Sequence, residues 1–102
     1  MRPDLIVEIT LKASSDGGRS RPIPSVPFSC PAFFGDEGFD CRLLLDQVGV
    51  SLAPGDRATV PLKFLRPELI VARVQPGDEF RLWALGFFAD GRVLEVLEPA
   101  KE

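Results

Sequence analysis

Three side chains in the first half of the chain carry nucleophilic atoms: Ser29, Cys30 and Cys41. A serine or cysteine nucleophile needs a neighbouring base, most often histidine, to take its proton. The sequence contains no histidine. No other base is marked by a motif or by its spacing from these three residues. The sequence therefore predicts that the protein is not an enzyme.

Four acidic residues cluster around a predicted turn and could be imagined as a metal site or an acid/base pair: Asp36, Glu37, Asp40 and Asp46. Their spacing is not that of a calcium-binding loop, in which ligands recur at fixed alternate positions. A solvated acidic hairpin is the favoured interpretation, and we expect no metal and no cofactor.

The two cysteines, Cys30 and Cys41, are too few for a disulfide framework. Without histidine they also cannot complete a common four-ligand zinc site. They flank a predicted hairpin and could lie near each other. A reduced pair is the favoured interpretation, and a disulfide is the alternative.

Composition and charge limit the class of partner. The chain has 102 residues, of which 45% are hydrophobic, with a formal net charge of −3 and a pI near 4.9. This length suits one domain with one core, and the acidic balance argues against a general nucleic-acid binder. Arg19, Arg21, Arg66 and Arg73 either form a local anion-binding or RNA-binding patch or, as we favour, are dispersed over the surface.

The sequence shows no targeting or membrane segment. The apolar run at residues 5–7 is too short for the core of a signal peptide. No stretch approaches the roughly 20 apolar residues of a spanning helix. We therefore expect a cytoplasmic protein with no membrane partner.

The strands that must position the candidate side chains are separated by turns, two of which are Pro-Gly-Asp turns at residues 54–56 and 76–78. Proline presets the first turn angle and glycine tolerates the next. Apolar residues alternate along 5–11 and 57–66, which predicts two strands with one buried face. Pro67 ends the second of these or forces a bulge.

The remaining segments also favour extended structure. Four prolines between 21 and 31 exclude a helix and predict an irregular edge. The sequence further predicts a turn at 35–38, after Phe33 and Phe34, and a strand over 39–48. Residues 68–74 are predicted to be extended in preference to a short helix. Phe80 and Leu82 are expected to face inward, followed by a hairpin turn at 89–91 and a last strand over 93–97.

About six strands joined by turns predict an all-β protein, an antiparallel Greek-key barrel that is closed or nearly closed. One barrel domain is expected over residues 1–98, followed by a short tail at 99–102.

The order of these motifs resembles the C-terminal barrel, domain III, of the elongation factor Tu family. The matching features are an opening strand at 7–11, Gly17-Gly18-Arg19 with Pro22, Phe33, the turn at 54–56, Pro67, Gly77 with Phe80, and a closing hairpin at 86–93. The likeness covers nearly the whole chain. It implies the same six-stranded barrel and a place in translation, where the barrel docks on a protein or on a tRNA-bearing complex through its aromatic strands and the hairpin at 85–92.

The chain departs from that family in two places, and it also lacks the family's GTPase motifs. The family's Arg-Pro-Gln-Phe stretch is replaced around residues 28–31, and its glycine-rich closing hairpin carries Phe87 and Asp90 here. The phosphate-binding Gly-x-x-x-x-Gly-Lys-Ser/Thr loop and the guanine-binding Asn-Lys-x-Asp motif are both missing. We therefore expect no GTP hydrolysis, and we expect the chain's own function where it departs from the family.

Apolar doublets add an expectation about the surface. Neighbouring side chains of a strand point to opposite faces, so Phe33-Phe34, residues 43–45 and Phe87-Phe88 cannot all lie inside one barrel. Outward aromatic side chains favour a noncatalytic binding module. The alternative is a protein-interaction or homodimerisation module with no role in translation. The predicted contact residues are Arg19, Arg21, Phe33, Phe34, Phe87, Phe88 and Arg92.

Overall fold

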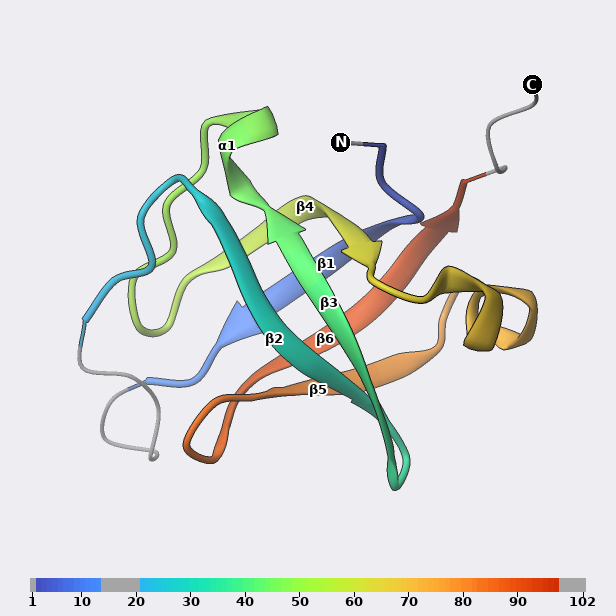
Figure 1. The fold of residues 1–102 in the computed structure, drawn as a ribbon. Helices are drawn as coiled ribbons and strands as arrows, with labels where there is room; N and C mark the ends of the chain where they lie inside the picture. Colours follow the sequence, from blue (N-terminus) through green and yellow to red (C-terminus); the bar gives the residue numbers. More distant parts are fainter. Residues whose placement is uncertain (1, 14–20, 98–102) are drawn as a thin grey trace.

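Six antiparallel strands close into a barrel in the computed structural model, which describes residues 2–13 and 21–97 (Figure 1). The strands are β1 (Leu5–Leu11), β2 (Pro27–Phe34), β3 (Glu37–Leu44), β4 (Arg57–Phe64), β5 (Glu79–Trp83) and β6 (Phe87–Val96). Their order around the barrel is β1-β4-β3-β2-β5-β6. Because β2, β3 and β4 are consecutive neighbours and β1 returns beside β4, the topology is a Greek key. The predicted fold class is confirmed.

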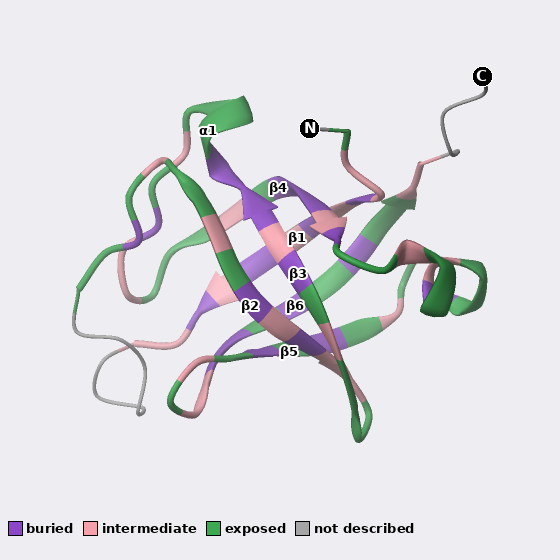
Figure 2. Cartoon of the chain, in the orientation of Figure 1, coloured by how far each residue is buried: buried purple, intermediate pink, exposed green. Residues whose placement is uncertain are grey.

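The barrel interior is built from alternate residues of each strand. In β1, Leu5, Val7, Ile9 and Leu11 are fully buried, whereas the residues between them are only half-buried. Val60 and Leu62 of β4 lie opposite Val7 and Leu5 and face the same interior. β5 alternates in the same way, whereas β4 buries the three consecutive residues 60–62, as the colouring of Figure 2 shows. The period of two read from the sequence is therefore the period of the inward-facing residues of β1 and β5.

Two glycines make room for aromatic rings on neighbouring strands. Gly91 of β6 pairs with Phe80 of β5, and a Cβ at Gly91 would overlap the Phe80 ring. Gly38 of β3 pairs with Phe33 of β2, whose ring lies 2.8 Å from where a Cβ would stand. Phe80 is buried, whereas Phe33 is half-exposed, so only the first ring is confined by the core.

The strand predicted over 39–48 is too long. β3 ends at Leu44, and Leu45–Val48 form one helical turn, α1, closed by Gly49 with φ 64°. Leu43, Leu44 and Leu45 are all buried. A strand can turn only alternate residues to one face, and the change to a helical turn buries the third leucine. The prediction was wrong because a continued strand would not turn all three consecutive leucines toward the core.

The extended segment predicted over 68–74 is also wrong. The structure has two 3₁₀ turns there, η2 (Pro67–Leu69) and η3 (Val71–Arg73). Pro67 stands at the start of η2, where its missing N–H costs nothing. Ile70 and Val74 are the buried residues of this stretch, and their spacing of four suits a helical path. Packing of these two residues overrides their β propensity.

The hairpin turn predicted at 89–91 lies elsewhere. Residues 89–91 are inside β6, which starts at Phe87, and the chain reverses at residues 84–86. Asp90 and Gly91 look like a turn in the sequence. Gly91 instead accommodates the Phe80 ring, which is a requirement set by a residue on another strand. The Gly17-Gly18-Arg19 loop and the tail at 99–102 lie outside the described residues.

Substituting Gly91 tests the confined ring. Gly91→Ala is expected to lower the free energy of unfolding by about 1–3 kcal/mol, because the added methyl overlaps Phe80 in a packed core. Gly38→Ala is the matched control, since Phe33 can swing toward solvent, and we expect a loss below about 1 kcal/mol. Urea denaturation measures both. Equal losses for the two variants would contradict the assigned role of Phe80.

Candidate functional site

The turn between β5 and β6 presents apolar side chains to solvent. Trp83 at the end of β5 is 41% exposed, and Leu85 in the turn is 100% exposed. The turn is closed by a hydrogen bond from the Ala84 N–H to the Gly86 carbonyl oxygen, at 2.8 Å. It lies at one end of the barrel, in the orange part of the chain in Figure 1. Leu85 is therefore uncovered by the described residues, and Trp83 is partly uncovered.

Leu85 also has an unfavourable backbone conformation. Its φ is +57°, and it is the one non-glycine residue with positive φ in the part of the chain that the structure describes. The left-handed region costs an ordinary L-residue roughly 1–2 kcal/mol. A leucine there contributes no core contact to offset this cost. Backbone strain of this kind and exposed apolar surface both concentrate at binding sites.

Two aromatic rings extend this apolar surface along the outside of the barrel. Phe33 and Phe87 meet edge to face, with ring centroids 5.4 Å apart. The Arg81 guanidinium stacks 3.9 Å from the centre of the Phe87 ring. Phe33 and Arg81 are direct cross-strand neighbours on β2 and β5. We call Trp83, Leu85, Phe87, Phe33 and Arg81 the hairpin surface.

The other two predicted phenylalanines point inward. Phe88 is buried and packs edge to face on Phe28, at 5.8 Å between ring centroids. Phe34 is half-buried and lies 5.0 Å from the Phe80 ring and 6.2 Å from the Phe64 ring. The structure thus divides each doublet, as the alternation of strand side chains requires. Phe33 and Phe87 are available to a partner, and Phe34 and Phe88 complete the core.

Most of the candidate arginines have carboxylate neighbours. Arg92 pairs with Glu79 at 3.8 Å and also lies opposite Glu8. The ion pairs of Arg66 with Glu68 and of Arg73 with Glu37 measure 2.6 Å and 3.3 Å. The Arg66 guanidinium lowers the pKa of the exposed Glu68. Arg21 is exposed, and Arg19 lies outside the described residues. The three paired arginines are dispersed and locally neutralised.

Cys30 and Cys41 are neighbours across the β2–β3 ladder, and both are buried free thiols. The Cys41 thiol donates to the Cys30 carbonyl oxygen, with Sγ and O 3.2 Å apart. Its pKa is raised well above the usual value by the hydrogen bond to the Cys30 side chain, by burial, and by repulsion from Cys30 and Asp40. A protonated thiol is a poor nucleophile, so the raised pKa does not activate Cys41.

The acidic hairpin shows no metal-binding geometry. Within residues 2–13 and 21–97, no three or more histidine, cysteine, aspartate or glutamate side chains gather as a metal would require. Glu37 of this hairpin pairs with Arg73 instead. In the same ranges, no helix has the length and apolar character to span a bilayer.

Fold and surface together define a closed Greek-key barrel with an apolar hairpin at one end. No protein-family model and no curated protein sequence matches this chain. The resemblance to the elongation factor Tu barrel therefore stays a prediction from the sequence.

Sequence reasoning included Leu85 only as the first residue of a docking hairpin at 85–92, and it missed Trp83 and Arg81. A signal for Trp83 was present, because Phe80 and Leu82 face inward and Trp83 is out of phase with them. The turn itself was misplaced at 89–91. The position of Arg81 depends on Phe87, a contact between two strands that spacing does not encode.

Because the pKa of Cys41 is raised, the free energy of unfolding should fall at alkaline pH. The folded state holds the thiol protonated, so its contribution to stability is complete below the unfolded pKa, about 8.5, and is lost as pH rises through the folded pKa. Urea unfolding from about pH 7 to about pH 10 should show this fall. Cys41→Ser keeps a donor to the Cys30 carbonyl without titrating, and we expect a shallower fall. Parallel pH profiles would contradict the assignment.

Proposed function

We propose that the protein is a noncatalytic binding module that docks on another protein through the hairpin surface. The observation that carries the proposal is Leu85, which is fully exposed and has a φ of +57°. Folding alone favours glycine or asparagine at such a position. A bulky apolar residue that destabilises the free protein can contribute binding energy when a partner buries its side chain.

The composition of the hairpin surface supports a protein as the partner. Tryptophan, phenylalanine and arginine are enriched at the centres of protein interfaces, where large flat groups exclude water. Arg81, held flat on Phe87 at 3.9 Å, is already ordered, so less rotamer entropy is lost when a partner covers it.

Electrostatics favour a protein over RNA. The net charge is −3, and Arg92, predicted as a contact residue, lies between Glu8 and Glu79. An RNA-binding surface needs unpaired positive charge along its backbone contacts. Following the resemblance to the elongation factor Tu barrel, we propose a protein of the translation machinery as the first class of partner to test.

Leu85→Asn should separate binding from folding. Asparagine tolerates the left-handed region, so the free energy of unfolding should be unchanged or rise by up to about 1 kcal/mol. Capture of the partner from a lysate of the source organism should be lost. Leu69→Asn makes the same change at an exposed leucine of η2 and should leave capture intact. Urea denaturation and quantitative mass spectrometry of the captured proteins provide the two measurements.

Three outcomes would overturn the proposal. Equal capture by wild type and Leu85→Asn would exclude the hairpin surface as the docking site. Capture that is abolished by ribonuclease and weakens steeply with salt would assign an RNA partner. A wild-type dimer in light scattering that Leu85→Asn converts to monomer would assign the surface to self-association.

A further inference from the structure

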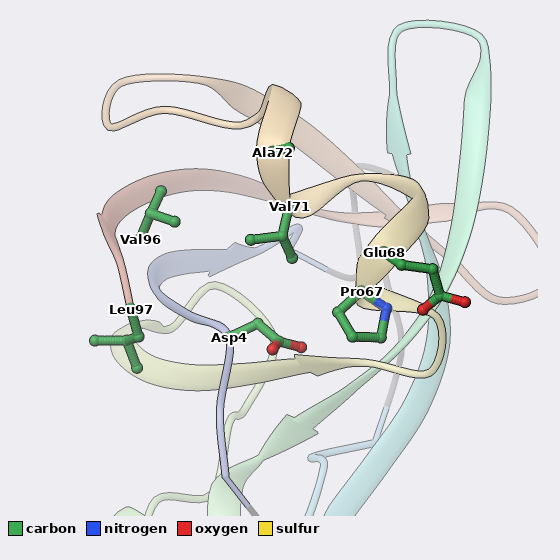
Figure 3. Close-up of a pocket in the computed structure, with 7 residues that line it drawn as sticks. All are labelled: Asp4, Pro67, Glu68, Val71, Ala72, Val96 and Leu97. Carbon is green, nitrogen blue, oxygen red and sulfur yellow. The ribbon is translucent and has the colours of Figure 1, made fainter. Parts of the chain in front are cut away.

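A concave site lies at the opposite end of β6 from the hairpin surface. Its volume is about 570 Å³, within the range of pockets that hold small organic ligands. Figure 3 shows its walls, with Val71 and Ala72 of η3 on one side and Val96 and Leu97 at the end of β6 on another. Pro67, Glu68 and Asp4 complete the lining.

The carboxylate of Asp4 is the polar group in the wall between β1 and Pro67 (Figure 3). Its Oδ2 atom accepts hydrogen bonds from the Phe64 N–H at 2.8 Å and from Lys63 Nζ at 3.0 Å. No described residue donates a hydrogen bond to Oδ1. The backbone of Asp4 is fixed as well, since its N–H donates to the Leu62 carbonyl and its carbonyl accepts from the Leu97 N–H. Asp4 is therefore a positioned acceptor with one oxygen to offer.

The charges of the lining have one sign. Asp4 and Glu68 are its two ionisable residues, and the other five are apolar. The nearest cation of Asp4, Lys63, is not part of the lining. Glu68 stands at the rim and is engaged by Arg66. An apolar cavity with a carboxylate in its wall is complementary to a ligand with a positive head and an apolar body.

We propose that this pocket binds a small organic amine, with its ammonium group on Asp4 and its hydrocarbon part between Val71 and Val96. The ammonium group donates to Asp4 Oδ1, and the apolar part displaces water from the walls. Charge-assisted hydrogen bonds of this kind are stronger than neutral ones. The pocket and the hairpin surface are at different ends of the barrel, so the two proposals succeed or fail separately.

Lys63 limits the affinity of the site. Its ammonium group already lies 3.0 Å from Asp4, so it partly neutralises the carboxylate and repels a second cation. Lys63 is also the cross-strand neighbour of Arg42, a like charge. Removing Lys63 therefore exposes the charge of Asp4 and relieves a repulsion within the barrel wall.

Three probes of equal length test the chemistry of the ligand: hexylammonium, hexanol and hexanoate. NMR titration of the full chain should show saturable shifts at Val71, Val96 and Leu97 with hexylammonium, with a dissociation constant on the order of 1 mM for so small a ligand. Hexanol should bind several-fold more weakly, because it lacks the charge. Hexanoate should not bind, because Asp4 and Glu68 repel it.

Two variants with opposite expected effects test the role of Asp4. Asp4→Asn keeps an oxygen that can accept from the Phe64 N–H and should weaken hexylammonium binding about 10-fold. Lys63→Met should tighten binding about two- to fivefold. Glu8→Gln removes one carboxylate from the outside of β1, away from the lining, and should leave the affinity unchanged.

The proposal is overturned if hexylammonium produces no saturable shifts at the lining residues. It is equally overturned if the three probes bind alike, which would mean an unselective apolar cavity. Equal weakening by Asp4→Asn and Glu8→Gln would assign the effect to net charge. Weaker binding by Lys63→Met, in a variant that retains the wild-type amide spectrum outside the site, would also contradict it.

Discussion

Pairing of β1 on both edges is the constraint on which the rest of this molecule depends. Leu5–Leu11 pairs with β4 on one side and β6 on the other, which closes the barrel and leaves this strand no free edge. Its alternate residues fill the centre of the core. The residues just beyond its ends are fixed too: Lys12 N–H donates to the Phe88 carbonyl near the hairpin surface, and Asp4 N–H donates to the Leu62 carbonyl beside the pocket that Asp4 lines. One buried strand therefore positions both ends of the barrel.

The barrel is least complete between β2 and β5, where only Ala32 and Phe33 pair with Leu82 and Arg81. Proline at 27 and 31 removes two N–H donors from β2. Beyond these two pairs, side-chain packing connects β2 to the β5–β6 hairpin, because Phe28 of β2 contacts Phe88 of β6 edge to face. Phe88 thus holds the β5–β6 hairpin from inside while Leu85 is exposed at its turn. An anchored hairpin with an uncovered tip can meet a partner without unfolding the barrel.

The sequence pattern predicted the strands and turns that depend on residues close together in the chain. Alternation identified β1 and β4, because the alternate apolar residues of both strands face the core, and the glycines of the two Pro-Gly-Asp turns have the positive φ that such turns require. The misplaced turn at 89–91 failed because the need for Gly91 comes from Phe80 on the paired strand. The 3₁₀ turns were missed because Ile70 and Val74 are buried by long-range packing that their β propensity does not reflect.

The candidate site was only partly predictable for a related reason. The doublets predicted that some of these phenylalanines face outward, but which member of each doublet does so depends on strand register. The other residues with positive φ in the described chain are glycines, Gly35, Gly49, Gly55, Gly77 and Gly86. Glycine therefore occupies five of the described positions with positive φ, and the sixth is a fully exposed leucine, a residue type that disfavours this backbone conformation. This leucine adds no core contact to the isolated barrel, so the contact with a partner that we propose is what would offset its backbone cost. Under the proposed function, Leu85 is therefore the position at which the requirements of folding and of binding separate.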